Sequence, residues 1–222
     1  MENLPTGAKI ETGQLWSQVI NRPQSLYEGA LFLDRDGVII QETNYLHRPE
    51  EVILIAGAAN VIAEANNLAL PVIIVTNQAG IARGKYGWEE FIDVQEKIIQ
   101  LLNNQGAFIN AVFACPHHAD GKPPFKTANH PWRKPNPGML LEAAQRLPIN
   151  LSKSWIIGDK ASDIQAASNA GLLGGTHVLT GHGGDSGERT KALNLNSVNF
   201  KCLTSDSIAG TENILTDLLR KK

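Results

Sequence analysis

Three aspartates at the ends of separate apolar runs are the residues of this sequence best suited to chemistry. Asp34 and Asp36 follow the run Ala30–Leu33, and Asp159 follows the run Trp155–Gly158. Both runs are typical of buried strands in a parallel sheet, so we expect the three carboxylates at the sheet edge where ligands bind. Two carboxylates about 4 Å apart repel each other by roughly 4 kcal/mol at an effective dielectric of 20. A hard divalent cation such as Mg²⁺ removes this repulsion and commonly pairs with a substrate phosphate.

Cationic and hydroxyl side chains suited to a phosphoryl group follow other elements of the chain. Thr76 and Asn77 end another apolar run and offer a hydroxyl group and backbone donors. Arg133 and Lys134 follow a long loop, and Lys160 comes directly after the third aspartate. Mg²⁺, lysine and hydroxyl groups that face one cleft make a phosphoryl-transfer site. A carboxylate that attacks phosphorus in such a site would form an aspartyl-phosphate intermediate.

Alternating strands and helices must position these residues. Apolar runs predict five strands, at residues 30–33, 71–75, 108–114, 154–158 and 176–180. Apolar residues at helical spacing predict helices between them, for example through Phe91, Val94 and Ile98. Strand–helix–strand units of this kind are right-handed and parallel, and five strands connected in this way specify an open α/β sheet.

The two ends of the chain are expected to add little to the sheet. We interpret residues 1–28 as an N-terminal arm that packs on the core through a short amphipathic face, and residues 29–222 as one domain. Residues 185–206 resemble a loop, and residues 208–219 are expected to form a terminal helix. The residues of the amphipathic face are Leu15, Trp16, Val19 and Ile20.

Composition excludes several classes of function. The chain has 222 residues and a net charge of −2, which gives no argument for binding nucleic acid or an anionic membrane. No apolar stretch is long enough to span a bilayer, and no secretory signal is recognisable. The only cysteines are Cys115 and Cys202, which suits a reducing compartment. We therefore expect a cytoplasmic monomer whose partner is a small molecule.

Four short motifs resemble those of the haloacid-dehalogenase-like (HAD-like) phosphatases, in the same order. The Asp-Arg-Asp-Gly motif alone is equally typical of a charged turn, but four motifs in order across five strands are specific. The match is closer to the branch of the D-glycero-D-manno-heptose 1,7-bisphosphate phosphatases and their histidinol-phosphatase relatives. The motifs are Asp34-Arg35-Asp36-Gly37, Thr76-Asn77-Gln78, Lys134 in Arg-Lys-Pro-Asn-Pro-Gly, and Gly158-Asp159-Lys160 with Asp163.

The resemblance implies a three-layer α/β sandwich with a parallel five-stranded sheet in the order 5-4-1-2-3 and no large cap domain. By the family pattern, Asp34 is the nucleophile and Asp36 is the general acid and then base. Mg²⁺ would be bound by Asp34, Asp159 and the backbone carbonyl of Asp36. Further roles that the pattern implies are phosphate binding by Thr76, Asn77, Lys134 and Lys160, substrate recognition by Arg133, and orientation of Lys160 or a metal-bound water by Asp163. We expect Arg35 to point away from the site.

The long loop at residues 115–132 departs from the family pattern. Zinc-binding members have Cys-x-His and then Cys-x-Cys before Arg-Lys-Pro, whereas here the closing pair falls on His130 and Trp132. Tryptophan does not bind zinc, and a closed structural site needs four nitrogen or sulfur ligands. A zinc site from Cys115, His117 and His130, with His118, stays open beside the simpler interpretation that packing alone holds the loop.

The function that follows is a Mg²⁺-dependent phosphomonoester hydrolase acting on a small metabolite, with heptose 1,7-bisphosphate as the expected substrate. Histidinol-phosphate phosphatase is an alternative, since both substrates are phosphate esters. A non-catalytic phospholigand-binding module on the same scaffold is the third interpretation, although every expected catalytic position is filled. A bisphosphate should depend on Arg133, because a guanidinium group can grip a second anionic group.

Overall fold

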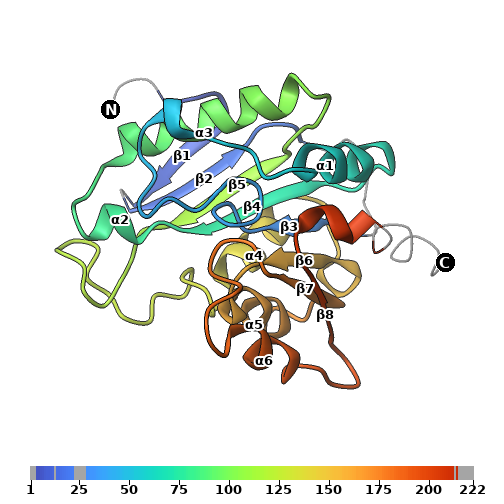
Figure 1. Ribbon diagram of the computed structural model, residues 1–222. Helices are drawn as coiled ribbons and strands as arrows, with labels where there is room; N and C mark the ends of the chain where they lie inside the picture. Colours follow the sequence, from blue (N-terminus) through green and yellow to red (C-terminus); the bar gives the residue numbers. More distant parts are fainter. Residues whose placement is uncertain (1–3, 13, 23–28, 213, 215–222) are drawn as a thin grey trace.

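The computed structural model describes residues 4–12, 14–22, 29–212 and 214. Its strands form one mixed sheet in the order β1-β2-β5-β4-β3-β6-β7-β8 (Figure 1). The strands are β1 (Ala8–Glu11), β2 (Leu15–Val19), β3 (Leu31–Leu33), β4 (Val72–Asn77), β5 (Ala111–Cys115), β6 (Trp155–Gly158), β7 (Gly174–Val178) and β8 (Lys201–Ser205).

The expected parallel sheet of five strands is wrong, because the described sheet has eight strands and mixed directions. The strands predicted from apolar runs are its central members, β5-β4-β3-β6-β7, and they run parallel to one another. β3 lies between β4 and β6, so the carboxyl ends of these three strands meet at one edge of the sheet. The segments that follow β3, β4 and β6 therefore share one region.

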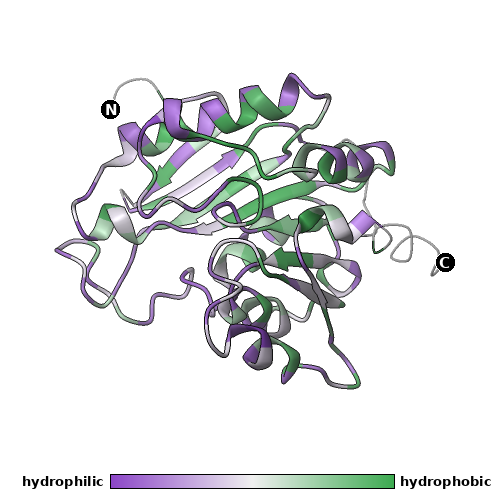
Figure 2. Ribbon diagram, in the orientation of Figure 1, coloured by the Kyte–Doolittle hydropathy of each residue, from purple (hydrophilic) through white to green (hydrophobic). Residues whose placement is uncertain are grey.

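Helices cover both faces of the sheet and make three layers (Figure 1). Leu31 and Leu33 of β3 pack in one apolar cluster with α1 and α3, whereas Phe32 packs in a second cluster with α4, α5 and α6. In Figure 2, β4 and β6 are hydrophobic along most of their length, while α3 alternates hydrophobic and hydrophilic residues. The helices are α1 (Ala58–Asn67), α2 (Ala79–Ala82), α3 (Trp88–Asn103), α4 (Gly138–Arg146), α5 (Ala161–Asn169) and α6 (Glu188–Leu193), with 3-10 turns at Pro49–Glu51, Leu151–Lys153 and Ile208–Thr211.

The N-terminal segment joins the sheet instead of packing on the core as an arm. β1 and β2 form an antiparallel pair, and β2 continues the sheet antiparallel to β5. Trp16 is fully buried against Trp88 and Phe91. A short apolar run fits a strand as well as one face of a helix, which is why spacing alone misplaced this segment.

The C-terminal part also contains more regular structure than expected. Residues 185–206, expected as a loop, contain α6 and the parallel edge strand β8. Cys202 is the one buried residue of β8, and the polar residues of the strand hid it from a search for apolar runs. Of the expected terminal helix, the structure describes the turn Ile208–Thr211, and most of the remainder lies outside the described residues. None of the described helices has the length and apolar character needed to cross a membrane.

Candidate active site

A cleft of about 530 Å³ lies beyond the carboxyl ends of β3, β4 and β6. The loop that follows β3 and the long loop that follows β5 both contribute to its wall. The fold thus brings together residues that are up to 148 positions apart in sequence, from residue 34 to residue 182. The predicted site residues that line it are Asp34, Asp36, Thr76, Asn77, Arg133, Lys134 and Lys160.

Three buried carboxylates converge at the base of this cleft. One oxygen each of Asp34, Asp159 and Asp163 lies within 4.8 Å of the other two. Asp159 Oδ2 accepts a hydrogen bond of 2.7 Å from the His182 backbone N–H, whereas Asp159 Oδ1 has no hydrogen-bond partner among the described residues. The carboxylate of Asp36 stands apart from this cluster.

The electrostatics of the cluster fit a divalent cation. Burial raises the pKa of Asp34 to about 6, although nearby Lys134 opposes the shift. Burial, followed by repulsion from Asp34 and Asp163, raises the pKa of Asp159 to about 8. An unpaired, buried carboxylate oxygen beside two other carboxylates is a costly arrangement that a bound cation would stabilise. Oxygen ligands of this kind are those that Mg²⁺ prefers.

Lys134 is the buried lysine of the site. Its Nζ lies 2.8 Å from Asp34 Oδ1 and 2.7 Å from Asp163 Oδ1, and it also donates to the Val75 carbonyl at 2.8 Å. Burial alone would lower the pKa of Lys134, but the attraction of Asp163 and Asp34 raises it. Lys134 therefore stays charged beside the predicted nucleophile, as a phosphate-binding group requires.

Asp163 contacts the side chain of one site lysine and the backbone of the other. Its Oδ1 pairs with Lys134, and its Oδ2 accepts the Lys160 backbone N–H at 3.0 Å, which caps the first turn of α5. Orientation of the Lys160 side chain or of a metal-bound water by Asp163 stays a prediction. This buried aspartate links the helix start to the site lysine.

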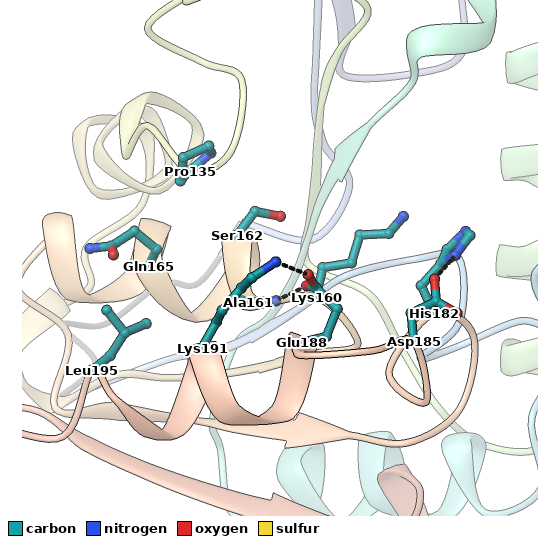
Figure 3. Close-up of a pocket in the computed structure, with 10 residues that line it drawn as sticks. All are labelled: Pro135, Lys160, Ala161, Ser162, Gln165, His182, Asp185, Glu188, Lys191 and Leu195. Atoms are coloured by element: carbon teal, nitrogen blue, oxygen red, sulfur yellow. Dashed lines mark hydrogen bonds and ion pairs between the residues drawn. The ribbon is translucent and has the colours of Figure 1, made fainter.

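Lys160 stands where the cleft meets a second cavity of about 580 Å³. In Figure 3 its side chain extends away from the ion pair that Lys191 makes with Glu188. Glu188 also accepts the Ala161 backbone N–H at 2.7 Å. The Lys160 ammonium group donates no hydrogen bond within the described part of the chain. It is therefore available to an anion in the cleft.

Thr76 and Asn77 end β4 at the cleft wall. Thr76 Oγ1 accepts a hydrogen bond from Gln78 Nε2 at 2.9 Å. Asn77 exchanges two hydrogen bonds of 3.1 Å with the backbone N–H and carbonyl of Lys134. The Asn77 side chain thus holds residue 134 in place. Because its amide nitrogen and oxygen each already make one hydrogen bond, fewer donors remain for the phosphate that Asn77 was expected to bind.

Arg35 does not point away from the site as expected. Its guanidinium group is buried and pairs with the Asp36 carboxylate at 3.0 and 3.1 Å.

Gly37, which follows Asp36, has a φ of 84°, and a Cβ there would lie 2.4 Å from Asp159 Oδ2. Glycine at position 37 therefore lets the nucleophile loop approach the third aspartate.

The geometry of the long loop does not fit a tetrahedral zinc site. Cys115 Sγ lies 3.8 Å from His130 Nδ1, which also accepts the Trp132 backbone N–H. The rings of His117 and His130 are stacked 4.0 Å apart and nearly parallel, so their nitrogens do not converge on one ion. Burial lowers the pKa of His130 to about 4, which keeps the stacked pair uncharged.

Two basic residues of the cleft, Arg83 and His118, were missed in the sequence as partners of the predicted Arg133. Arg83 Nη2 lies 3.2 Å from His118 Nε2, and both residues line the cleft with Arg133. Burial and then repulsion from Arg133 and Arg83 lower the pKa of His118, while Asp120 opposes this from an exposed position. Arg83 also donates a hydrogen bond to the Tyr45 hydroxyl. Arg83, in the glycine-containing segment that follows β4, was the feature of the sequence that could have indicated this group.

Comparisons with known proteins find similar sequences among phosphatases. A HAD-hydrolase-like family model matches residues 131–198. A D-glycero-beta-D-manno-heptose-1,7-bisphosphate 7-phosphatase of Mesorhizobium japonicum is 48% identical over 146 residues, which cover 66% of this chain and 67% of the relative. A D-glycero-alpha-D-manno-heptose-1,7-bisphosphate 7-phosphatase of Burkholderia mallei is 40% identical over 151 residues, covering 68% and 78%.

Solved structures show the same architecture. A crystal structure described as a HAD-like phosphatase from Mesorhizobium loti matches with a TM-score of 0.79 and 38% identity, covering 92% of this chain and 93% of the other. A D,D-heptose 1,7-bisphosphate phosphatase of B. bronchiseptica, solved with magnesium and phosphate, matches with a TM-score of 0.70 and 28% identity, covering 87% and 99%.

Proposed function

The chain belongs to the HAD-like hydrolase family and is a phosphatase, and on this premise we propose that it removes the 7-phosphate of a D-glycero-D-manno-heptose 1,7-bisphosphate in a Mg²⁺-dependent reaction. The observation that carries the proposal is the unpaired Oδ1 of Asp159, buried beside Asp34 and the charged Lys134. Relatives named for the beta anomer and for the alpha anomer are both similar, so the proposal covers either anomer.

The chemistry is divided between two aspartates of one loop. Asp34 attacks phosphorus and becomes phosphorylated, and Asp36 gives a proton to the departing sugar oxygen. Asp36 then takes a proton from the water that hydrolyses the aspartyl phosphate. Lys134, Thr76 and Lys160 hold the phosphoryl oxygens. Mg²⁺, held by Asp34, Asp159 and the Asp36 carbonyl, would supply positive charge against the phosphoryl oxygens.

The basic group of Arg83, His118 and Arg133 supports a substrate with a second phosphate. These residues line the same cleft as Asp34. Repulsion within the group contributes to the lowered pKa of Arg133, after burial, and a second anion would relieve it. Histidinol phosphate has no second phosphate and carries a positively charged amine, so the two arginines disfavour it.

A phosphate-release assay with Mg²⁺ on heptose 1,7-bisphosphate and on histidinol phosphate tests the proposal. We expect the bisphosphate to be the better substrate, and Asp34→Asn to abolish release while circular dichroism shows an intact fold. Arg133→Met should lower kcat/KM for the bisphosphate by about 10- to 100-fold, because a charged hydrogen bond of about 1.5–3 kcal/mol is lost. Normal turnover by Asp34→Asn, or no hydrolysis of any phosphate ester by the wild type, would refute the mechanism.

A further inference from the structure

The carboxylate of Asp36 is held by two buried side chains that no reaction step described above uses. Arg35 donates from Nε to Asp36 Oδ2 at 3.1 Å and from Nη2 to Oδ1 at 3.0 Å. Gln78 Nε2 donates to the same Oδ2 at 2.9 Å. Oδ2 therefore accepts two hydrogen bonds and Oδ1 accepts one. Since the Asp36 side chain is 17% exposed and lines the cleft, Oδ1 is the oxygen with capacity left for a ligand.

Arg35 is fixed by packing rather than by solvent. The side chain is 1% exposed, and its guanidinium group lies over the Phe91 ring, 5.5 Å from the ring centre. Its Nη1 has no hydrogen-bond partner among the described residues. Burying a guanidinium group has a large desolvation cost, and the bidentate pair with Asp36 is the ion pair that offsets it. The plane of that pair consequently sets the plane of the carboxylate.

Gln78 is oriented by a tyrosine. The Tyr86 hydroxyl donates a hydrogen bond to Gln78 Oε1, which leaves Gln78 Nε2 facing Asp36 and Thr76. The Tyr86 ring packs directly against Gly80, where a Cβ would lie 2.2 Å from a ring carbon. The amide therefore has one orientation, with its donor toward the carboxylate.

We propose that Arg35 and Gln78 are positioning residues that aim Asp36 Oδ1 at the departing oxygen of the substrate. The inference rests on the proposed function and assigns different roles to the two oxygens of Asp36: Oδ1 transfers the proton, and Oδ2 holds the carboxylate in place. In the first half of the reaction the Oδ1–H bond breaks and the proton moves to the sugar oxygen as its bond to phosphorus breaks. In the second half Oδ1 takes a proton from water as the water oxygen bonds to phosphorus and the bond to Asp34 breaks. Oδ2 keeps its hydrogen bonds in both halves.

The test compares two phosphate esters in the first turnover. Nitrophenolate leaves without a proton, whereas an alkyl alcohol such as glycerol needs one from Asp36. The variants are Gln78→Met, Arg35→Lys and Tyr86→Phe, with Asp36→Asn as the reference for complete loss of proton transfer. Gln95→Met is the matched control, because Gln95 is an equally buried glutamine whose amide has no partner within the described residues.

For glycerol phosphate, Gln78→Met and Arg35→Lys should slow alcohol release in the first turnover by about 100-fold, the effect of a misplaced catalytic group. For p-nitrophenyl phosphate the burst of nitrophenolate should keep its wild-type rate, and slow turnover should follow as phosphoenzyme accumulates. Tyr86→Phe should show the same pattern more weakly, and Gln95→Met should match the wild type for both esters.

Equal slowing of both first turnovers in the Arg35 and Gln78 variants would mean that these residues are merely structural and would overturn the inference. Unchanged rates with both esters would overturn it as well. A wild-type protein that hydrolyses neither these two esters nor heptose 1,7-bisphosphate would instead refute the proposed function, so the two failures are distinguishable.

Discussion

Lys134 is the single residue on which most of the buried charge depends. Its ammonium group contacts two carboxylates within 2.8 Å, and both are buried. Without it, Asp34 and Asp163 would face each other with no counter-charge. Removing one partner of a buried ion pair is far more costly than removing a surface pair.

We therefore expect Lys134→Met to lower the free energy of unfolding by about 3–5 kcal/mol, measured by urea denaturation without added metal. Lys191→Met removes a lysine that is 67% exposed and should cost less than about 1 kcal/mol. Equal losses in the two variants would contradict the central role of Lys134.

At this scale the sequence predicted residue types better than residue contacts. Asp34, Asp36, Lys134 and Lys160 line the predicted cleft, because strand ends are readable from apolar runs. The direction of the Arg35 side chain was wrong, since alternation along a strand does not extend into the turn that follows it. That turn is formed by residues 35–40, where the backbone N–H groups of residues 39 and 40 both bond to the Arg35 carbonyl.

Among the elements, the β1–β2 hairpin contributes most that the apolar pattern did not predict. β2 pairs with β5, so it covers an edge that the predicted sheet would have left open. Trp16 packs against both Trp88 and Phe91 of α3, with ring centres 6.0 and 5.4 Å away. The hairpin thus anchors α3 to the sheet through aromatic contacts.

Trp16→Ala should lower the free energy of unfolding by about 3–5 kcal/mol, because it empties a fully buried site in the aromatic cluster. Tryptophan fluorescence during urea unfolding measures the loss. Val198→Ala, at a position that is 99% exposed, serves as the control and should change stability by less than about 0.5 kcal/mol. A loss below about 1 kcal/mol in Trp16→Ala would mean that the hairpin is not part of the cooperative core.

Pairing partners at the sheet margins are the part of the architecture that a single sequence does not reveal. β4 and β5 are apolar over most of their length because both of their faces are buried, and they were found for that reason. The hairpin and β8 are short, carry polar residues and take their place from partners distant in sequence. Local periodicity contains no information on those partners.

For the molecule as a whole, the carboxylate cluster couples metal binding to stability and to pH. The pKa values of Asp34 and Asp159 rise from an ordinary 3.8 to about 6 and about 8 in the folded protein. Between pH 4 and pH 8 the folded state therefore binds more protons than the unfolded state. Under that condition the free energy of unfolding of the metal-free protein falls as the pH rises.

Because protons compete with Mg²⁺ for these oxygens, the increase in Tm on adding Mg²⁺ should be larger at pH 8 than at pH 5. Thermal unfolding at the two pH values, once with excess Mg²⁺ and once with EDTA to remove metal, measures this increase in Tm. Asp159→Asn should abolish the Mg²⁺ effect at both pH values. An effect of equal size at the two pH values would contradict the coupling.

The position of β3 in the middle of the sheet has a consequence for synthesis on the ribosome. A nascent chain that ends near residue 150 contains β4 and β5 but lacks β6, so one side of β3 exposes unpaired backbone groups. The nucleophile loop is made early, yet its acidic partner is among the later residues to emerge. We therefore expect a chain truncated near residue 150 to be inactive, because it lacks Asp159, and to aggregate through the unpaired edge of β3.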